Sequence, residues 1–196
     1  ADLPKYLFGQ EDSAEIHLAL GTTLGFGFIG FFDDYRKLRR RNSAGMSGRQ
    51  KLFWQFVVAS LAAGILFLLP GFQSTVTIPF FKDLQPDIGL WYIPFAALVM
   101  VGASNAVNLT DGLDGLAIGP VMIAGFTYGL FAYVSGHARI ADYLQVPHVL
   151  GSAEITVFCG ALVAAGMGFL WFNAYPAQMF MGDVGSLSLG AALGIV

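Results

Sequence analysis

Long apolar runs alternate with short polar connections along the 196 residues of the chain. A membrane-spanning helix needs about 20 mostly apolar residues, and five runs approach that length before a sixth begins near the last residue. The predicted spans are residues 16–32, 52–70, 90–109, 116–135, 155–172 and, cut at the last residue, 184–196. The pattern predicts an all-α integral membrane protein, a polytopic bundle in a lipid bilayer, with residues 1–196 forming a single membrane-embedded domain.

The composition agrees with a membrane location, because 56% of the residues are hydrophobic and only 12% are charged, against roughly 25% charged residues in soluble domains. The formal net charge is −3 and no polar segment presents a basic face, which argues against nucleic acid as a partner. The single cysteine, Cys159, excludes a disulfide framework. The chain begins at Ala1 without an initiator methionine and ends inside an apolar run, so we expect it to be a fragment truncated at both ends.

The basic residues predict the orientation of the helices. Connections with odd numbers, counted along the chain, lie on one side of the membrane, and the first of them, residues 33–51, holds seven of the ten lysines and arginines. Basic connections face the cytoplasm, so we assign the odd connections to that side. In the external connection 71–89, β-branched residues between turn formers suggest a small β-hairpin. The external connection 136–154 suggests a short interfacial helix.

Five aspartates lie at the ends of apolar runs, and all five fall in the odd connections: Asp33, Asp34, Asp111, Asp114 and Asp183. Ionisable residues at membrane depth are costly and usually functional. Mg²⁺ is typically held by one or two carboxylates together with substrate phosphates. The sequence therefore predicts a cytoplasmic site for a phosphorylated substrate and a divalent cation.

Each of these motifs also has a structural interpretation. Asp33 and Asp34 could be interfacial charges paired with nearby arginines, although adjacent like charges disfavour simultaneous ionisation and so suit a proton acceptor. Residues 105–116 could be a helix end followed by an Asp-rich turn, and Asp183 could be a helix N-cap. Basic residues of the first connection could hold phosphates or only set topology; Lys37, Arg39 and Lys51 are the candidates.

Three motifs together resemble the polyprenyl-phosphate N-acetylhexosamine-1-phosphate transferase superfamily. They are Phe31-Phe32-Asp33-Asp34-Tyr35, residues 105–116, and residues 172–177 with 182–186. Within the superfamily, residues 47–51, 107–117 and 181–187 are similar to the branch that uses a muramoyl-pentapeptide donor.

The resemblance implies a fold of ten transmembrane helices, of which this chain would supply about six. It implies an Mg²⁺-dependent enzyme of peptidoglycan synthesis in the bacterial inner membrane, with its active site facing the cytoplasm. The implied reaction transfers phospho-N-acetylmuramoyl-pentapeptide from UDP-MurNAc-pentapeptide to undecaprenyl phosphate and releases UMP. A homo-oligomer is left open.

The resemblance also implies site residues. It assigns catalysis to Asp33, Asp34 and Asp183, with Asp183 as the metal ligand. The substrate-binding residues that it implies are Lys37, Lys51, Asn108, Asp111, Gly112, Leu113, Asp114, Asn173 and Phe180. A histidine-rich loop of the family would lie beyond Val196.

For the mechanism, we expect Mg²⁺ on Asp183 to bridge the donor diphosphate while Asp33 accepts the proton of the acceptor phosphate. A two-step route through an aspartyl intermediate remains an alternative. A sister enzyme that uses UDP-N-acetylglucosamine is the nearest rival, and an ion-coupled transporter is a rival from another class. A transporter should carry polar groups near the bilayer midplane on broken helices. A non-catalytic scaffold would leave the carboxylates unexplained.

Overall fold

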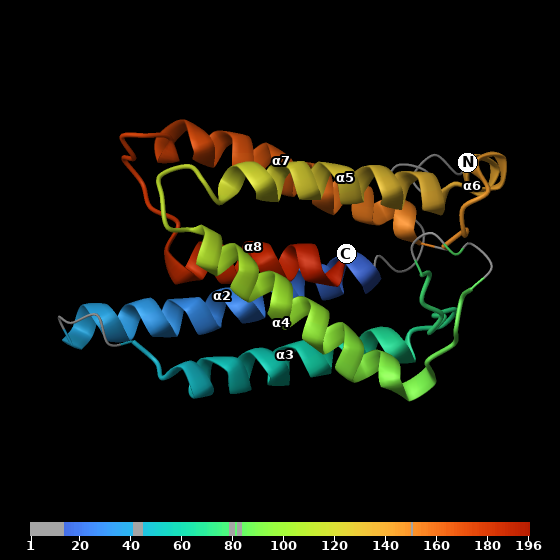
Figure 1. Ribbon diagram of the computed structural model, residues 1–196, viewed down its shortest axis with the longest axis horizontal. Helices are drawn as coiled ribbons and strands as arrows, with labels where there is room; N and C mark the ends of the chain where they lie inside the picture. Colours follow the sequence, from blue (N-terminus) through green and yellow to red (C-terminus); the bar gives the residue numbers. More distant parts are fainter. Residues whose placement is uncertain (1–13, 41–44, 79–80, 82–83, 150) are drawn as a thin grey trace, which may run out of the picture.

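The structure, a computed structural model, describes residues 14–40, 45–78, 81, 84–149 and 151–196. Helices dominate this part of the chain (Figure 1). They are α2 (Ala14–Arg40), α3 (Gly48–Leu68), the 3₁₀ turn η1 (Gly89–Trp91), α4 (Tyr92–Thr110), α5 (Ile118–Gly136), α6 (Ala138–Leu144), α7 (Ser152–Asn173) and α8 (Gly182–Ile195). Five helices, all except α6 and α8, are long and apolar enough to cross a membrane. The predicted fold class, a polytopic all-α membrane protein, is confirmed.

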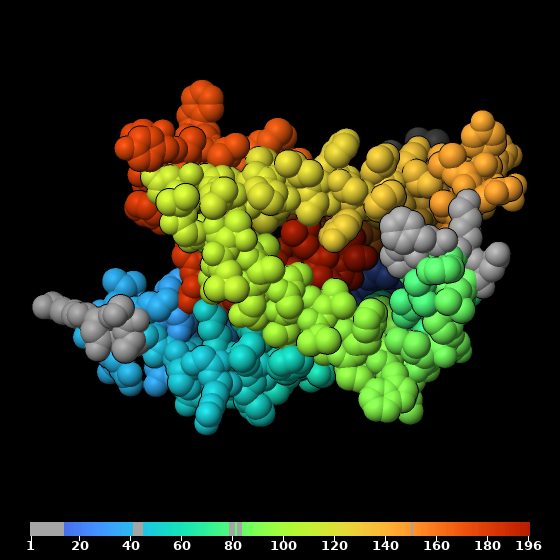
Figure 2. Space-filling view, viewed as in Figure 1, coloured from blue at the N-terminus to red at the C-terminus, as the bar shows by residue number. Residues whose placement is uncertain are grey.

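Helix α8 lies in the middle of the bundle and packs against both α2 and α4 (Figure 1). Helix α3 packs against α4 and α2, whereas α5 and α7 form a pair that meets the other helices through α8 and α2. On the face shown in Figure 2, atoms of α8 are visible between those of α4 and α5. Helix α8 therefore joins the group formed by α2, α3 and α4 to the pair formed by α5 and α7.

The outward surfaces of the long helices are apolar, as expected of helices that face lipid. Leu24 and Phe28 on α2, Ile123 on α5 and Val157 on α7 are all exposed. Small residues fill much of the interior, and Ala59, Ala63 and Ala191 belong to the main buried cluster. Such residues allow transmembrane helices to approach closely.

The first helix is longer than the predicted span 16–32, since α2 continues to Arg40. Residues 31–40 contain no proline or glycine. The ion pair from Lys37 to Asp33 joins residues one turn apart, and basic side chains favour the C-terminal end of a helix. Helix α3 begins at Gly48 rather than Leu52 because Ser47 caps it, accepting a hydrogen bond from the Gln50 amide at 3.3 Å. Both changes bring basic residues of the connection onto ordered helices.

The segments that connect α3 to η1 and α5 to α7 are less regular than the long helices. The hairpin suggested for residues 71–89 is reduced, within the described residues, to an isolated antiparallel bridge between Thr75 and Asp87. Pro86 beside it has no amide hydrogen with which to extend a ladder. Two hydrogen bonds from the side chain of Ser74 and the amide of Gly89 hold the pKa of Asp87 below its usual value. The short helix expected within residues 136–154 is present as α6.

A few polar side chains are buried between the helices. Gln55 of α3 is fully buried and accepts a 2.7 Å hydrogen bond from Asn105 of α4, while its own Nε2 has no partner among the described residues. Ser104 of α4 donates to the carbonyl of Leu187 in α8 at 3.0 Å. These bonds link α4 to its two neighbours inside the bundle.

The closest approach between α2 and α8 occurs at Gly30. A Cβ atom placed on Gly30 would overlap the carbonyl oxygen of Asp183 and lie 2.7 Å from Cα of Val184. Backbone cannot give way as the end of a flexible side chain can. Glycine is therefore required at position 30 for α8 to begin directly against α2.

We predict that Gly30→Ala destabilises the protein by about 1–3 kcal/mol through overpacking, even though alanine favours a helix by up to about 1 kcal/mol over glycine. Gly21→Ala is the matched control, since it lies on the same helix and its added Cβ would meet nothing within 4 Å. Thermal unfolding of the complete polypeptide in detergent measures both variants. Equal unfolding temperatures would show that the α2–α8 contact tolerates the methyl group.

Candidate active site

Six helix ends gather at one end of the bundle (Figure 1). They are the C-terminal ends of α2, α4 and α7 and the N-terminal ends of α3, α5 and α8. All the site residues predicted from the sequence lie on these helix ends or in the segments beside them. The convergence expected from the alternation of the spans is thus present in the structure.

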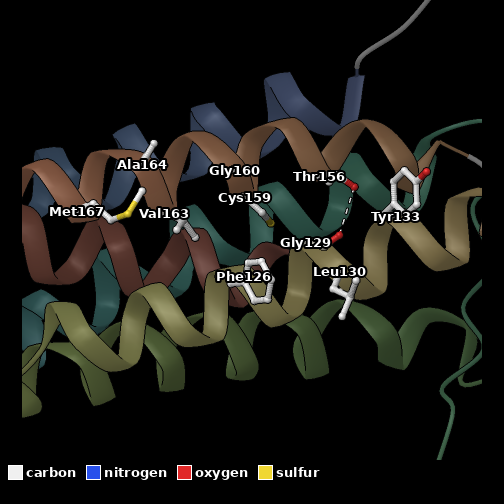
Figure 3. Close-up of a pocket in the computed structure, with 11 residues that line it drawn as sticks. Phe126, Gly129, Leu130, Tyr133, Thr156, Cys159, Gly160, Val163, Ala164 and Met167 are labelled. Carbon is white, nitrogen blue, oxygen red and sulfur yellow. Dashed lines mark hydrogen bonds between the residues drawn. The ribbon is translucent and has the colours of Figure 1, made fainter.

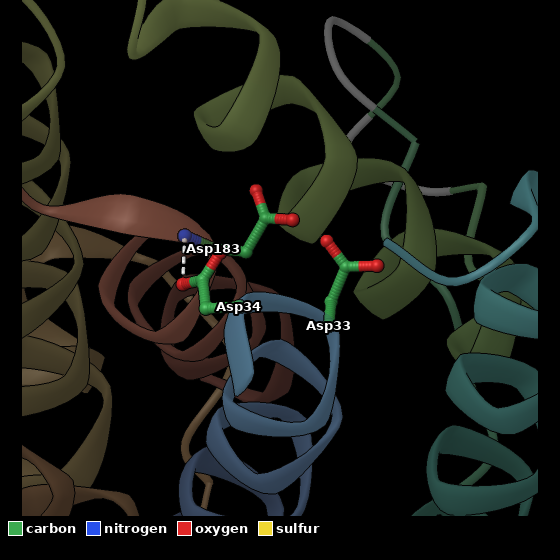
Figure 4. A group of neighbouring side chains, drawn as sticks. All are labelled: Asp33, Asp34 and Asp183. Carbon is green, nitrogen blue, oxygen red and sulfur yellow. Dashed lines mark hydrogen bonds between the residues drawn. The ribbon is translucent and has the colours of Figure 1, made fainter. Parts of the chain in front are cut away.

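Three carboxylates form the centre of this region. Asp33 and Asp34 come from α2 and Asp183 from the first turn of α8, and one oxygen from each lies within 4.8 Å of the others (Figure 4). Asp33 is buried, whereas Asp34 and Asp183 are partly exposed. Three carboxylates this close can all be ionised only when positive charges lie beside them.

Two lysines supply that positive charge. The ammonium nitrogen of Lys37 lies 2.6 Å from Asp33, 3.2 Å from Asp34 and 2.9 Å from Asp183. Lys51, in the first turn of α3, lies 2.9 Å from the same oxygen of Asp183. The lysines thereby connect α2, α3 and α8 through one charged cluster.

Asp34 also caps helix α8. Its Oδ2 accepts hydrogen bonds from the amides of Asp183 at 3.0 Å and Val184 at 3.3 Å. The first amides of a helix have no partners within the helix, and a carboxylate there also opposes the positive end of the helix dipole. The capping considered for Asp183 is thus supplied by the side chain of Asp34, from another helix.

Asp33 is enclosed by the segment that precedes α3. The amide of Met46 donates to Oδ1 of Asp33, and Lys37 pairs with Oδ2. A Cβ on Gly45 would lie 2.7 Å from the carboxyl carbon of Asp33. Asp33 therefore has both oxygens engaged and lies under a segment that packs closely because residue 45 is a glycine.

Helix α4 contributes polar groups next to α8. Oδ1 of Asn108 accepts a 2.7 Å hydrogen bond from the hydroxyl of Ser186, which is buried. Asp111, just after the end of α4, is partly buried. Burial and the nearby negative charge of Asp183 raise the pKa of Asp111, so Asp111 binds a proton more readily than an exposed aspartate does.

Asp114 and Asn173 connect the two loops beside the cluster. Asp114 accepts a 3.0 Å hydrogen bond from the amide of Ala177. Asn173 accepts one from the amide of Gly115 at 3.1 Å and donates one to the carbonyl of Met179 at 2.8 Å. These two predicted site residues hold the α4–α5 and α7–α8 loops in contact.

Gly112, Leu113 and Phe180 lie on the same loops, with Leu113 and Phe180 strongly exposed. None of the three lines the cavity of about 430 Å³ that lies between α5 and α7 (Figure 3). That cavity is bordered by apolar and small side chains such as Phe126, Gly129 and Val163, and it is separate from the charged cluster.

Sequence reasoning missed two contributors. Ser186 lies one turn after Asp183, so its position on the same face of α8 was a usable signal. The amide of Met46 could not have been identified from residue type, because any residue except proline carries a backbone amide. Arg39, a candidate phosphate ligand, is not part of the charged cluster, because no ion pair joins it to the three carboxylates.

The cluster fits a divalent cation by its donor atoms. Carboxylate oxygens are the ligands that Mg²⁺ prefers, and Lys37 already places a positive charge where the three aspartates meet. Asp183 is partly exposed and would hold the ion, while Asp33 is covered by Gly45 and Met46.

Comparison with known proteins gives a consistent result. Residues 16–196 match the family described as glycosyl transferase family 4. The chain is 56% identical over 190 residues to the phospho-N-acetylmuramoyl-pentapeptide-transferase of Oleidesulfovibrio alaskensis, 57% over 194 residues to that of Pelobacter propionicus and 62% over 181 residues to that of Nitratidesulfovibrio vulgaris. These alignments cover 97%, 99% and 92% of the chain, but 53%, 54% and 51% of the relatives. The chain spans about half the length of the relatives that it matches.

We predict that Asp34→Ala lowers the free energy of unfolding by about 1 kcal/mol through loss of the cap on α8, whereas Asp34→Asn keeps most of it because asparagine caps helices about as well as aspartate. The ion pair with Lys37 is partly exposed and adds little. Chemical or thermal unfolding of the complete polypeptide in detergent compares the variants. Equal losses would rule out capping as the structural role of Asp34.

Proposed function

The chain belongs to glycosyl transferase family 4, and we propose that it is the central part of an enzyme that makes the first lipid-linked intermediate of peptidoglycan. The proposed reaction transfers phospho-N-acetylmuramoyl-pentapeptide from UDP-MurNAc-pentapeptide to undecaprenyl phosphate. An oxygen of the lipid phosphate forms a bond to the β-phosphorus of the donor. The bond from that phosphorus to the bridging oxygen breaks, and UMP leaves.

One observation carries this proposal. Relatives named as phospho-N-acetylmuramoyl-pentapeptide-transferases share more than half of the residues over nearly all of the chain. The charged cluster gives independent support, because phosphoryl transfer depends mainly on positioning and on offsetting negative charge. A cytoplasmic location of the active site is supported by the basic residues near the same helix ends.

Lys37 and Lys51 are proposed to bind and orient the phosphates of the two substrates. Both ammonium groups are partly exposed and lie beside Asp183. Mg²⁺, held by Asp183, would supply additional positive charge for the diphosphate when bound. The loops tied together by Asp114 and Asn173 would contact the nucleoside through Gly112, Leu113 and Phe180.

The sequence alone favoured Asp33 as the proton acceptor for the lipid phosphate. We now propose Asp34 for this step and a positioning role for Asp33. In support, the side chain of Asp34 is 29% exposed, whereas that of Asp33 is 5% exposed. Asp33 would hold Lys37 in place.

The rival functions make different demands. In an ion-coupled transporter, polar groups should cluster at broken helices near the midplane, but the aspartates here lie at helix ends and the spanning helices are continuous. A sister enzyme using UDP-N-acetylglucosamine would share the charged cluster, so only the donor separates it from the proposal.

The identity of the sugar-nucleotide donor distinguishes the proposed function from that of the sister enzyme. We expect the complete polypeptide, supplied with undecaprenyl phosphate and Mg²⁺, to form a lipid-linked product and UMP from radiolabelled UDP-MurNAc-pentapeptide and not from UDP-N-acetylglucosamine. Thin-layer chromatography of the lipid phase measures the product. Transfer from UDP-N-acetylglucosamine alone would assign the chain to the sister activity.

We predict that Asp183→Asn lowers the apparent affinity for Mg²⁺ in the transfer assay by at least about tenfold, because the ion loses one of few carboxylate ligands. Residual activity should therefore rise as Mg²⁺ is increased. Asp114→Asn is the control, since Asp114 binds the amide of Ala177 outside the cluster. If both variants show the wild-type dependence on Mg²⁺, Asp183 is not a metal ligand.

The proton-acceptor assignment predicts a pH dependence. A phosphate monoester loses its second proton near pH ~6, so a base matters below that pH and becomes unnecessary above it. The activity of Asp34→Asn relative to wild type should rise as pH increases through this range, while that of Asp33→Asn should stay low and flat. The opposite result would return the proton-acceptor role to Asp33.

A further inference from the structure

The basic residues of the first connection divide into two groups in the structure. Lys37 and Lys51 turn toward the aspartates and form four ion pairs with them. Arg36, Arg39 and Arg40 form no ion pair with any carboxylate in the part of the chain that the structure describes. The charged cluster therefore does not account for these three guanidinium groups.

The arginines share a separate hollow at the end of α2. This hollow, of about 380 Å³, is lined by Tyr35, Arg36, Arg39 and Arg40. Arg36 and Arg40 are one helical turn apart, as are Tyr35 and Arg39, so the four side chains form one patch on the helix. Arg39 and Arg40 are exposed. A compact patch of unpaired guanidinium groups matches a phosphate group, which such forks bind with several hydrogen bonds.

The hollow lies at the depth of lipid headgroups. With 27 residues, α2 is about 40 Å long at 1.5 Å per residue, against a hydrocarbon thickness of about 30 Å. The last turns of α2 carry its basic side chains, which are costly inside hydrocarbon, so we place the excess length at this end. Toward the membrane, Phe28 and Phe31 are exposed, and the ring of Phe31 stacks on that of Tyr35 at 6.0 Å. An apolar surface thus leads directly to the basic hollow.

We propose that this hollow binds the phosphate of an anionic phospholipid in the leaflet next to the charged cluster, with an acyl chain lying along Phe31 and Phe28. Juxtamembrane arginines attract anionic lipids of the cytoplasmic leaflet. A free phosphate ion would use the arginines but not the adjacent apolar surface. The bound lipid would anchor the end of the helix that carries Asp33, Asp34 and Lys37, so the membrane composition would act on the site through α2.

The test is lipid binding to the complete polypeptide in detergent, measured by native mass spectrometry with phosphatidylglycerol and, as the neutral comparison, phosphatidylcholine with the same chains. The double variant Arg36→Gln/Arg40→Gln should weaken the tightest phosphatidylglycerol binding by roughly tenfold and leave phosphatidylcholine binding unchanged. The matched control, Arg49→Gln/Arg139→Gln, removes two charges from exposed positions outside the hollow. It should retain wild-type binding.

Equal phosphatidylglycerol binding by the wild type and the Arg36→Gln/Arg40→Gln variant would overturn the proposal. So would an equal loss in the control variant, which would indicate attraction by net charge alone. Displacement of the lipid by millimolar inorganic phosphate would assign the hollow to free anions instead. Unfolding temperatures should match among all the proteins, because the four substituted arginines make no ion pair in the described residues. Binding is read without the transfer reaction, so its outcome is independent of the proposed function.

Discussion

The backbone contact between α2 and α8 at Gly30 determines where the charged groups of the site can lie. Because α8 starts directly against α2, its first amides come within reach of Asp34, and Asp183 is carried to the side of Asp33 and Lys37. Helix α8 also packs against α4, which brings Asn108 to Ser186. One close approach, made possible by a missing methyl group, thus brings residues from distant parts of the sequence into one cluster.

The two lysines of the cluster offset the negative charge of its three aspartates. Three aspartates at the edge of the bundle would repel one another, and Lys37 counters this because its ammonium group contacts all three. Lys51 adds a second positive charge from another helix. Arg36, Arg39 and Arg40 form no ion pair with these aspartates among the described residues, so the basic run of the sequence divides into two groups.

Much of the arrangement could be predicted from the sequence because hydrophobic length and charge placement determine it. The spans, their alternation and the meeting of Asp33, Asp34 and Asp183 all follow from those two properties. The difference in exposure between Asp33 and Asp34 does not, since it depends on how the backbone of Gly45 and Met46 folds over one of two adjacent carboxylates. The β-hairpin suggested for residues 71–89 is likewise limited to one bridge among the described residues, because Pro86 has no amide hydrogen with which to extend it.

The buried hydrogen bond between Gln55 and Asn105 has a consequence for the height of the site in the membrane. Gln55 follows Lys51 by one helical turn, which is about 5.4 Å along α3. Sliding α3 along α4 by that distance would separate the two amides and leave Gln55 without its hydrogen-bond partner in an apolar interior, which is costly. The pair therefore fixes the position of α3 along α4, and this keeps the ammonium group of Lys51 beside Asp183.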